Sequence, residues 1–145
     1  MKKYFTKADI INQEALERDI IETSKRLIDG KINSHRKSDE ETIEDTELGL
    51  VLEYYLMQHD PKYKKATELN SKDYYHDLVN TESGEIYECK VTRSGLGWNC
   101  AYVKRCVESI IKSDWNKSKW MHVADYDRTC GIYTYKGVKQ IRFKI

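Results

Sequence analysis

Three residues in the middle of the chain have the types and the spacing that metal-assisted hydrolysis requires. They are Asp77, in segment 74–79, and Glu88 and Lys90, in segment 84–90. Both segments are short and rich in tyrosine, valine and isoleucine, and turn-forming residues separate them, so the sequence predicts a β-hairpin. Alternate residues of a strand share a face, so Glu88 and Lys90 project to the same side.

The length of the turn decides whether Asp77 and Glu88 meet. If Asn80 and Glu85 close a four-residue loop, Asp77 lies opposite Glu88 with its side chain on the same face. Opposed residues of an antiparallel pair are about 4.5–5.5 Å apart. Two carboxylates this close repel unless a cation lies between them, and Mg²⁺ prefers such oxygen ligands. The backbone carbonyl of Cys89 could add a ligand, so Asp77, Glu88 and Cys89 form the predicted metal site.

Lys90 would complete the chemistry of this site. Beside a metal-bound water, its ammonium could position the nucleophile, stabilise the charge that develops on the phosphate, or help to remove a proton. Asp77, Glu88 and Lys90 together therefore predict metal-assisted hydrolysis of phosphodiester bonds. The alternative is an exposed charge pair between Glu88 and Lys90, which would contribute only a fraction of a kcal/mol.

An Asp on one strand followed by Glu-x-Lys on the next resembles the hallmark of the PD-(D/E)xK, or restriction-endonuclease-like, nuclease superfamily. Asp77, Glu88 and Lys90 match it in type, order and spacing, although no proline precedes Asp77. The resemblance covers residues 47 to about 135, and in size and layout the chain looks like compact type II restriction enzymes. It implies a single restriction-endonuclease-like α/β domain, with a mixed β-sheet flanked by helices, that acts as an Mg²⁺-dependent endonuclease on DNA.

The resemblance also implies a catalytic acidic residue on the helix before the hairpin. Glu47 suits this role because it shares a helical stripe with Ile43 and Leu50 and would face inward. Glu53 is the alternative, since it also neighbours apolar positions of the same helix. In either position the carboxylate needs a partner, because an unpaired buried charge is unfavourable.

Basic and aromatic residues around the hairpin predict the contacts to nucleic acid. In the superfamily, the loop after the Glu-x-Lys strand and the helix that follows tend to face the nucleic acid, where Arg and Lys meet phosphates. A flexible loop and a solvated helix face are the alternative interpretation. The predicted nucleic-acid-binding residues are Lys64, Lys65, Arg93, Ser94, Trp98, Lys104 and Arg105.

The remaining sequence must supply the elements that position these residues in one domain over residues 1–145. Residues 1–60 are predicted to be helical, with one helix over 8–29 after a Thr6–Asp9 capping box and a second from about 41 to the residue before Asp60-Pro61. The catalytic hairpin and sheet occupy 73–145, interrupted by a third helix after Asn99. The predicted strands are 73–79, 85–92, 120–126, 131–135 and 138–143.

Composition limits the classes of function. The net charge is only +1, so a polyanion would be bound by a local patch rather than by overall attraction. No run approaches the roughly 18 apolar residues that cross a bilayer, and the N-terminus lacks the apolar stretch of a signal peptide. We therefore expect a cytoplasmic protein without membrane contact. The four cysteines form no CxxC pair, which favours reduced thiols over a zinc site.

Several alternatives remain open at this stage. The biological setting resembles a restriction, phage or mobile-element endonuclease, or a Holliday-junction resolvase. A non-catalytic DNA-binding protein on the same fold is the main alternative, and a structural or inhibitory protein is a third. The sequence does not separate DNA from RNA or reveal a recognition site. The helix over 8–29 has more apolar residues than a lone surface helix needs, so we expect it to contribute to a homodimer.

Overall fold

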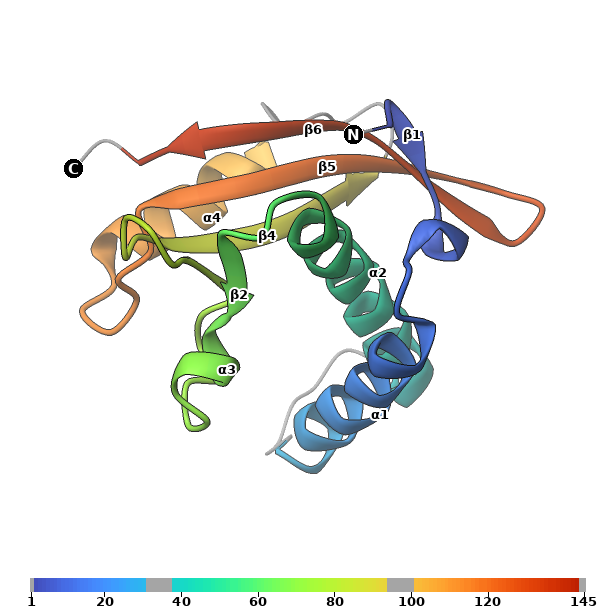
Figure 1. The fold of residues 1–145 in the computed structure, drawn as a ribbon, viewed down its shortest axis with the longest axis horizontal. Helices are drawn as coiled ribbons and strands as arrows, with labels where there is room; N and C mark the ends of the chain where they lie inside the picture. The colour runs from blue at the N-terminus through green and yellow to red at the C-terminus, as the bar shows by residue number, and fades with distance from the viewer. Residues whose placement is uncertain (1, 31–37, 94–100, 144–145) are drawn as a thin grey trace.

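The computed structural model describes residues 2–30, 38–93 and 101–143, which form a mixed six-stranded β-sheet with α-helices packed against it (Figure 1). The strand order is β1-β6-β5-β4-β3-β2, with β4 and β5 parallel and the other neighbours antiparallel. The mixed α/β fold expected from the sequence is confirmed. The elements are β1 (Tyr4–Phe5), a 3₁₀ helix (Lys7–Asp9), α1 (Gln13–Asp29), α2 (Asp39–His59), β2 (Tyr63–Lys65), α3 (Ala66–Leu69), β3 (Leu78–Asn80), β4 (Ile86–Arg93), α4 (Ala101–Lys112), β5 (Trp120–Thr129) and β6 (Ile132–Arg142).

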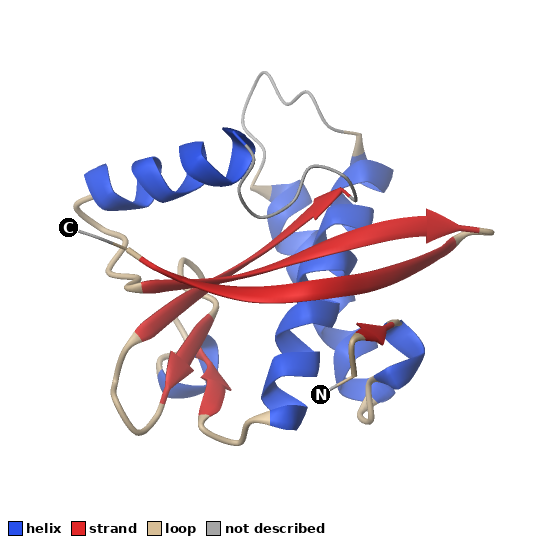
Figure 2. Ribbon diagram, turned by 90° about the horizontal axis from the view of Figure 1, so that it is seen from above, coloured by secondary structure: helices blue, strands red, loops and turns tan. Residues whose placement is uncertain are grey.

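The helices pack on two faces of the sheet. On one face, α1 and α2 cover Tyr87, Cys89 and Ala124 in the larger hydrophobic core. On the other, α4 packs against Met121 and Val123 in a smaller core. Figure 2 shows α2 running across the sheet and α4 lying to one side of it. Because side chains alternate along a strand, Glu88 and Lys90 of β4 belong to the face that α4 covers.

The two N-terminal helices begin at side chains that cap them. Ser38 forms a capping box with Glu41, so α2 begins at Asp39, close to the predicted start, and it ends at His59 just before Pro61. The predicted single helix over 8–29 is wrong at its start. The Thr6–Asp9 capping box closes a separate 3₁₀ turn, and Asn12 caps the α-helix that begins at Gln13.

The predicted hairpin has the expected register but a shorter first strand. Leu78 pairs with Tyr87 and Val79 with Ile86, and the Asn80 N–H donates to the Glu85 carbonyl at 2.9 Å. This register places Asp77 opposite Glu88, as the four-residue loop requires. Residues 73–77 are not a strand, however. The Asp73 carboxylate instead accepts hydrogen bonds from the backbone N–H groups two and three residues later, which folds this segment into a turn.

The predicted division into strands 131–135 and 138–143, with a turn at Lys136-Gly137 between them, is wrong, because β6 continues through these two residues. Gly137 has φ of 63°, and the register between β5 and β6 shifts by one residue opposite Ala124. These are the features of a β-bulge, which glycine permits without strain. The hairpin turn lies earlier, at Cys130-Gly131, where both residues have positive φ as a two-residue turn requires.

A buried histidine completes the larger core. The His122 ring is 1% exposed and lies 5.0 Å from the Tyr87 ring and 5.2 Å from the Tyr63 ring, centroid to centroid. Among the described residues neither ring nitrogen has a hydrogen-bond partner. Burial lowers the pKa of His122 to about 4, so the ring is neutral in the folded protein at neutral pH.

Helix α1 is amphipathic but leaves apolar residues uncovered. Leu16 and Ile20 are buried, whereas Ile21 is 66% and Leu27 48% exposed. The homodimer expected through this helix stays a prediction. Cys89, Cys106 and Cys130 form no disulfide, whereas Cys100 lies outside the described residues. Over the described ranges, no helix combines the length and the apolar character that spanning a membrane demands.

Candidate active site

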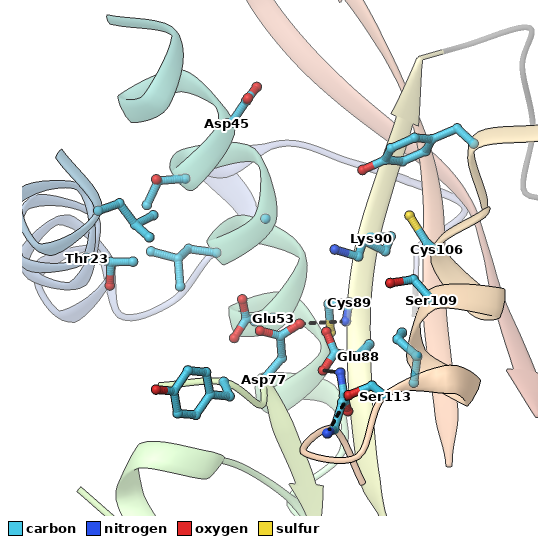
Figure 3. A pocket seen from close by; sticks show the side chains of 18 of the residues that line it. Thr23, Asp45, Glu53, Asp77, Glu88, Cys89, Lys90, Cys106, Ser109 and Ser113 are labelled. Atoms are coloured by element: carbon cyan, nitrogen blue, oxygen red, sulfur yellow. Dashed lines mark hydrogen bonds between the residues drawn. The ribbon is translucent and has the colours of Figure 1, made fainter. Parts of the chain in front are cut away.

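A cavity of about 810 Å³ lies between α2, α4 and the exposed edge of β4. It exists because β3 is short. Beyond Glu88 the edge of β4 has no strand partner on that side, and α2 approaches it instead. Figure 3 shows Glu53 reaching from α2, and Asp77 from the segment before β3, toward Glu88 and Lys90 on β4. Residues from three separate parts of the chain therefore meet in one cavity.

Asp77 and Glu88 are held together by direct contacts. The Asp77 Oδ2 atom accepts the backbone N–H of Cys89 at 2.8 Å, which fixes the carboxyl group against β4. The Asp77 and Glu88 carboxyl groups are also close enough to interact electrostatically, since the charge of Asp77 is, after burial, the next cause that raises the pKa of Glu88. The convergence of Asp77 and Glu88 expected from the hairpin register is confirmed.

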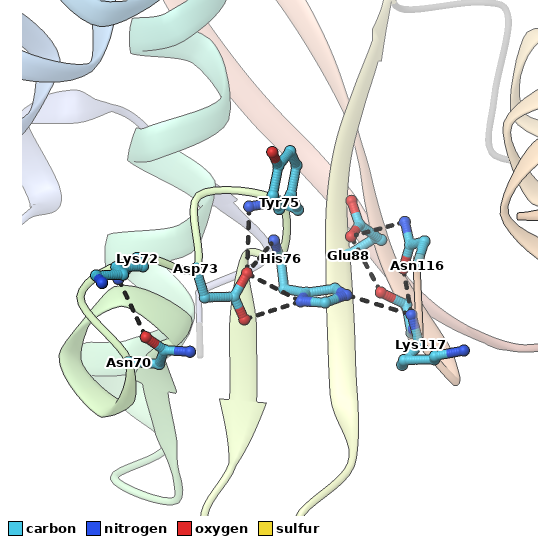
Figure 4. A network of polar contacts seen from close by, with 9 residues as sticks. Asn70, Lys72, Asp73, Tyr75, His76, Glu88, Asn116 and Lys117 are labelled. Atoms are coloured by element: carbon cyan, nitrogen blue, oxygen red, sulfur yellow. Dashed lines mark hydrogen bonds and ion pairs between the residues drawn. The ribbon is translucent and has the colours of Figure 1, made fainter. Parts of the chain in front are cut away.

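The segment between α4 and β5 holds Glu88 from the opposite side. Glu88 Oε1 accepts a hydrogen bond from Ser118 Oγ at 3.0 Å and a longer one from Asn116 Nδ2 at 3.4 Å. Both donors are buried. Figure 4 shows that this network continues to His76, whose Nε2 accepts the backbone N–H of Lys117 at 3.2 Å. His76 Nδ1 therefore carries the ring proton and donates it to Asp73 at 2.8 Å.

Three carboxyl groups in this cavity have raised pKa values. Burial raises the pKa of Glu88 to about 8, and the negative charge of Asp77 adds to the effect. Burial also raises the pKa of Asp77. The pKa of Glu53, which is 8% exposed, is raised well above its usual value by burial and then by Asp77. Groups with this combination of burial and like-charge neighbours are typical of functional sites.

Lys90 is a cation that lines the cavity close to the carboxyl groups. Burial acts to lower its pKa, but Tyr102, Asp77 and Glu88 outweigh burial, so the pKa of Lys90 is raised. Its side chain therefore carries a positive charge at neutral pH. Of the roles expected for Lys90, stabilising negative charge fits this protonation state, whereas removing a proton does not. The alternative of an exposed Glu88–Lys90 pair is wrong for Glu88, which is 6% exposed.

Glu47 is not at this site, which corrects the choice of helical carboxylate. Its Oε1 atom accepts the Lys7 ammonium at 2.6 Å, and it lines a different cavity with Tyr135. Six residues along a helix rotate the side chain by about 240°, so Glu47 and Glu53 lie on different faces. A signal for Glu53 existed in the sequence. The small residues Thr46 and Gly49 precede it on the face that lines the cavity.

The predicted nucleic-acid-binding residues do not all lie together. Arg105 lines the cavity, and Lys104 is exposed beside it on α4 without lining it. Arg93 and Lys64 are exposed on β4 and β2. The prediction of Lys65 as a phosphate contact is contradicted in part, because its ammonium is ion-paired with the Asp19 carboxylate and largely buried. Ser94 and Trp98 lie outside the described residues.

Sequence reasoning missed the residues that approach the cavity from a distance. Asn116 and Ser118 contact Glu88 from 28 and 30 residues away. Tyr75 and Trp115 line the same cavity, and their rings contact each other. The spacing of Ser113, Asn116 and Ser118 is typical of a turn with side-chain caps, but nothing in the sequence indicates which carboxylate it approaches.

The donor set fits a hard divalent cation in part. Glu53, Asp77 and Glu88 supply carboxylate oxygens, the ligands that Mg²⁺ prefers. Within the described ranges, however, no three His, Cys, Asp or Glu side chains are arranged as a complete metal site. Metal binding requires deprotonated carboxylates, so it would release a proton from Glu88, whose pKa is raised. Glu53, Asp77 and Glu88 are the residues that would hold Mg²⁺.

Comparisons of the chain with protein-family models, with curated proteins and with solved structures gave no match. The residues of this cavity and their geometry are therefore the observations that indicate a function.

Proposed function

We propose that this protein is an Mg²⁺-dependent endonuclease that hydrolyses phosphodiester bonds in DNA, on a restriction-endonuclease-like fold. The observation that carries the proposal is the convergence of Glu53, Asp77 and Glu88 around one cavity with the protonated Lys90. Their burial is unfavourable for folding, and a bound divalent cation would remove that cost. The resemblance of Asp77, Glu88 and Lys90 to the PD-(D/E)xK pattern supports the same reaction.

Each residue would have a separate role. When bound, Mg²⁺ would polarise the phosphate and supply a water of lowered pKa. Asp77 is already fixed by the Cys89 N–H, and Glu88 by Ser118 and Asn116, so their oxygens need little reorganisation. Lys90 would stabilise the negative charge that develops on the phosphate in the transition state. Arg105, on the α4 side of the cavity, would bind a phosphate oxygen.

The test is cleavage of supercoiled plasmid, linear duplex, single strands and a four-way junction, each with and without Mg²⁺. Glu53→Gln should abolish Mg²⁺-dependent cleavage. Glu47→Gln is its matched control, since it makes the same change on the same helix but outside the cavity, and it should cleave normally. Loss of cleavage in both variants would point to damage of the fold, and normal cleavage by a folded Glu53→Gln variant would overturn the proposal.

A non-catalytic DNA-binding protein is the second candidate. It is favoured by the raised pKa values of Asp77 and Glu88, because buried carboxyl groups that keep a proton do not require a metal to neutralise them. Tight binding that is independent of Mg²⁺, with the DNA intact after long incubation, would support this candidate. Selective cleavage of the four-way junction would instead assign the enzyme to the junction-resolving class.

A further inference from the structure

Among the exposed aromatic residues at the cavity that holds the carboxyl groups, two contact each other. Tyr75 belongs to the turn before β3 and Trp115 to the segment between α4 and β5, and both line the cavity. Their ring centroids are 5.4 Å apart and the rings are tilted by 56°. Yet Tyr75 is 69% and Trp115 is 61% exposed. The pair therefore contributes little to either hydrophobic core and keeps most of its ring surface available.

The backbone under these rings is held in place although the rings are exposed. The Asp73 carboxylate accepts the Tyr75 N–H at 3.2 Å, and the Ser113 hydroxyl accepts the Asn116 N–H at 2.9 Å. The contact between His76 and the Lys117 N–H ties the two segments to each other (Figure 4). The two rings are therefore presented by anchored turns, which reduces the entropy lost when a ligand stacks on them.

The charges of the same cavity indicate the kind of ligand. Arg105 and Lys90 line it and can bind an anionic group, whereas the carboxyl groups of Glu53, Asp77 and Glu88 suit a metal-bound phosphate. A ligand that satisfies both features has a phosphate next to a flat aromatic group. A nucleotide has this composition, and base–aromatic stacking tolerates any base because every base has a π-face.

We infer that Tyr75 and Trp115 form a stacking site for an unpaired nucleobase beside the scissile phosphate. This inference rests on the proposed function and adds a substrate class to it. Inside a regular duplex both faces of a base are covered by its neighbours, so only an unstacked base can enter such a site. The preferred substrate is therefore single-stranded DNA, or duplex DNA with a locally unpaired nucleotide.

The test measures affinity by fluorescence anisotropy without Mg²⁺, so that it does not depend on cleavage. The probes are a single-stranded deoxythymidine oligomer, a matched duplex, the same duplex with one bulged nucleotide, and a single-stranded RNA. Stacking on an aromatic side chain contributes about 1–3 kcal/mol per base, which corresponds to roughly 5- to 150-fold in affinity. Trp115→Ala and Tyr75→Ala should each weaken binding of the single strand and of the bulged duplex by this factor. Equal binding of the RNA would widen the substrate class to both nucleic acids.

Tyr4→Ala is the matched control. Tyr4 is an exposed aromatic residue, 52% accessible, on the edge strand β1, outside the cavity. It should bind all probes as the unchanged protein does, and Trp115→Phe, which keeps a ring, should bind nearly normally. Preference for the matched duplex, or unchanged single-strand binding by folded Trp115→Ala and Tyr75→Ala variants, would overturn the inference. Ring-dependent binding without any Mg²⁺-dependent cleavage would instead refute the endonuclease and leave the stacking site in place.

Discussion

A single acidic residue, Asp19, lies next to the cluster of Glu53, Asp77 and Glu88, and the surroundings of the two sites shift carboxyl pKa values in opposite directions. Asp19 of α1 is ion-paired with Lys65, and it accepts hydrogen bonds from the hydroxyl groups of Thr23 and Tyr54. Burial acts to raise its pKa, but these partners outweigh burial, so the pKa of Asp19 is lowered. Glu53 and Asp77 separate Asp19 from the larger cavity and line the cavities on both sides. On the far side, Glu53, Asp77 and Glu88 all have raised pKa values.

The difference separates a structural acid from candidate catalytic acids. The carboxylate of Asp19 is fully partnered, so its charge stabilises the fold. Glu53, Asp77 and Glu88 are buried beside one another, and Lys90 compensates them only in part. Such a cluster lowers the stability of the folded protein. Functional sites commonly keep groups that are needed for activity although they destabilise the fold.

The largest expected effect is on the rate of cleavage, and it distinguishes Lys90, beside the carboxyl cluster, from Lys65, beside Asp19. Lys90→Met should reduce Mg²⁺-dependent turnover by about 100- to 1,000-fold, because it removes the donor aimed at the developing charge. Lys65→Met should reduce turnover far less and should instead lower the melting temperature, because it leaves Asp19 buried without its cation. Steady-state cleavage and thermal unfolding of both variants check this. Equal loss of turnover in the two variants would contradict a catalytic role for Lys90 and a structural role for Lys65.

The next prediction concerns the free energy of unfolding, which neutralising Asp19 should lower and neutralising Glu88 should raise. Asp19→Asn should destabilise the protein by about 2–3 kcal/mol, since the largely buried Lys65 ammonium loses its partner. Glu88→Gln should stabilise the metal-free protein at pH 8 by about 1–2 kcal/mol, because it removes a buried carboxyl group whose charge is unfavourable. Urea unfolding at pH 8 in the presence of a chelator measures both. A destabilised Glu88→Gln variant would mean that Glu88 is as well partnered as Asp19.

A third prediction follows from the pKa values. The folded protein keeps the Glu88 proton up to about pH 8, whereas the unfolded chain releases it near its ordinary pKa of 4.5. The free energy of unfolding should therefore fall as the pH rises toward 8. Below pH 6.5 the buried His122 acts in the other direction, because the unfolded chain takes up a proton that the folded protein accepts only near pH 4. The interval from pH 6.5 to 8 thus isolates the carboxyl groups.

Mg²⁺ should reverse this fall in stability, because a bound cation would take the place of the proton that Glu88 holds. At ten times its dissociation constant the ion would stabilise the protein by about 1.4 kcal/mol. Unfolding experiments at pH 6.5 and 8, with and without Mg²⁺, measure the effect. Asp19→Asn should retain it and Glu88→Gln should lose it. An unchanged melting temperature at all Mg²⁺ concentrations would contradict a metal site.

The predictable parts of this molecule depend on local sequence. The register of Asp77 against Glu88 followed from a four-residue turn and strand alternation, which act over a few residues. The bulge at Gly137 was not predicted, because a glycine beside a lysine is equally typical of a turn and of a bulge. In physical terms, only the partner strand decides between them.

The parts that could not be predicted depend on long-range packing. Choosing Glu53 over Glu47 requires knowing which face of α2 meets the edge of β4. Lys65 was expected to contact a phosphate. Its ion pair with Asp19 could not be foreseen, because Asp19 lies 46 residues earlier in the chain. The contacts of Glu88 with Ser118 and of Tyr75 with Trp115 also join residues that are distant in the sequence, so only the folded structure shows them.

The smallest expected effect concerns two neighbours on α4. Lys104 is exposed beside the cavity, and its charge would attract a phosphate without contact to the reacting groups. Lys104→Ala should weaken DNA binding modestly and reduce the slope of log affinity against log salt by about one. The metal requirement should not change. Arg105→Ala, which alters a residue lining the cavity, should also lower the turnover of bound substrate.

Anisotropy across a salt series, together with single-turnover cleavage, separates these two effects. Lys104→Ala should have the shallower salt slope with a normal single-turnover rate, and Arg105→Ala should show both changes. The reason is position: a phosphate bound outside the cavity contributes equally to the ground state and the transition state, so it changes affinity alone. A normal single-turnover rate for Arg105→Ala would place both side chains outside the chemistry and leave Lys90 as the cation that acts on the transition state.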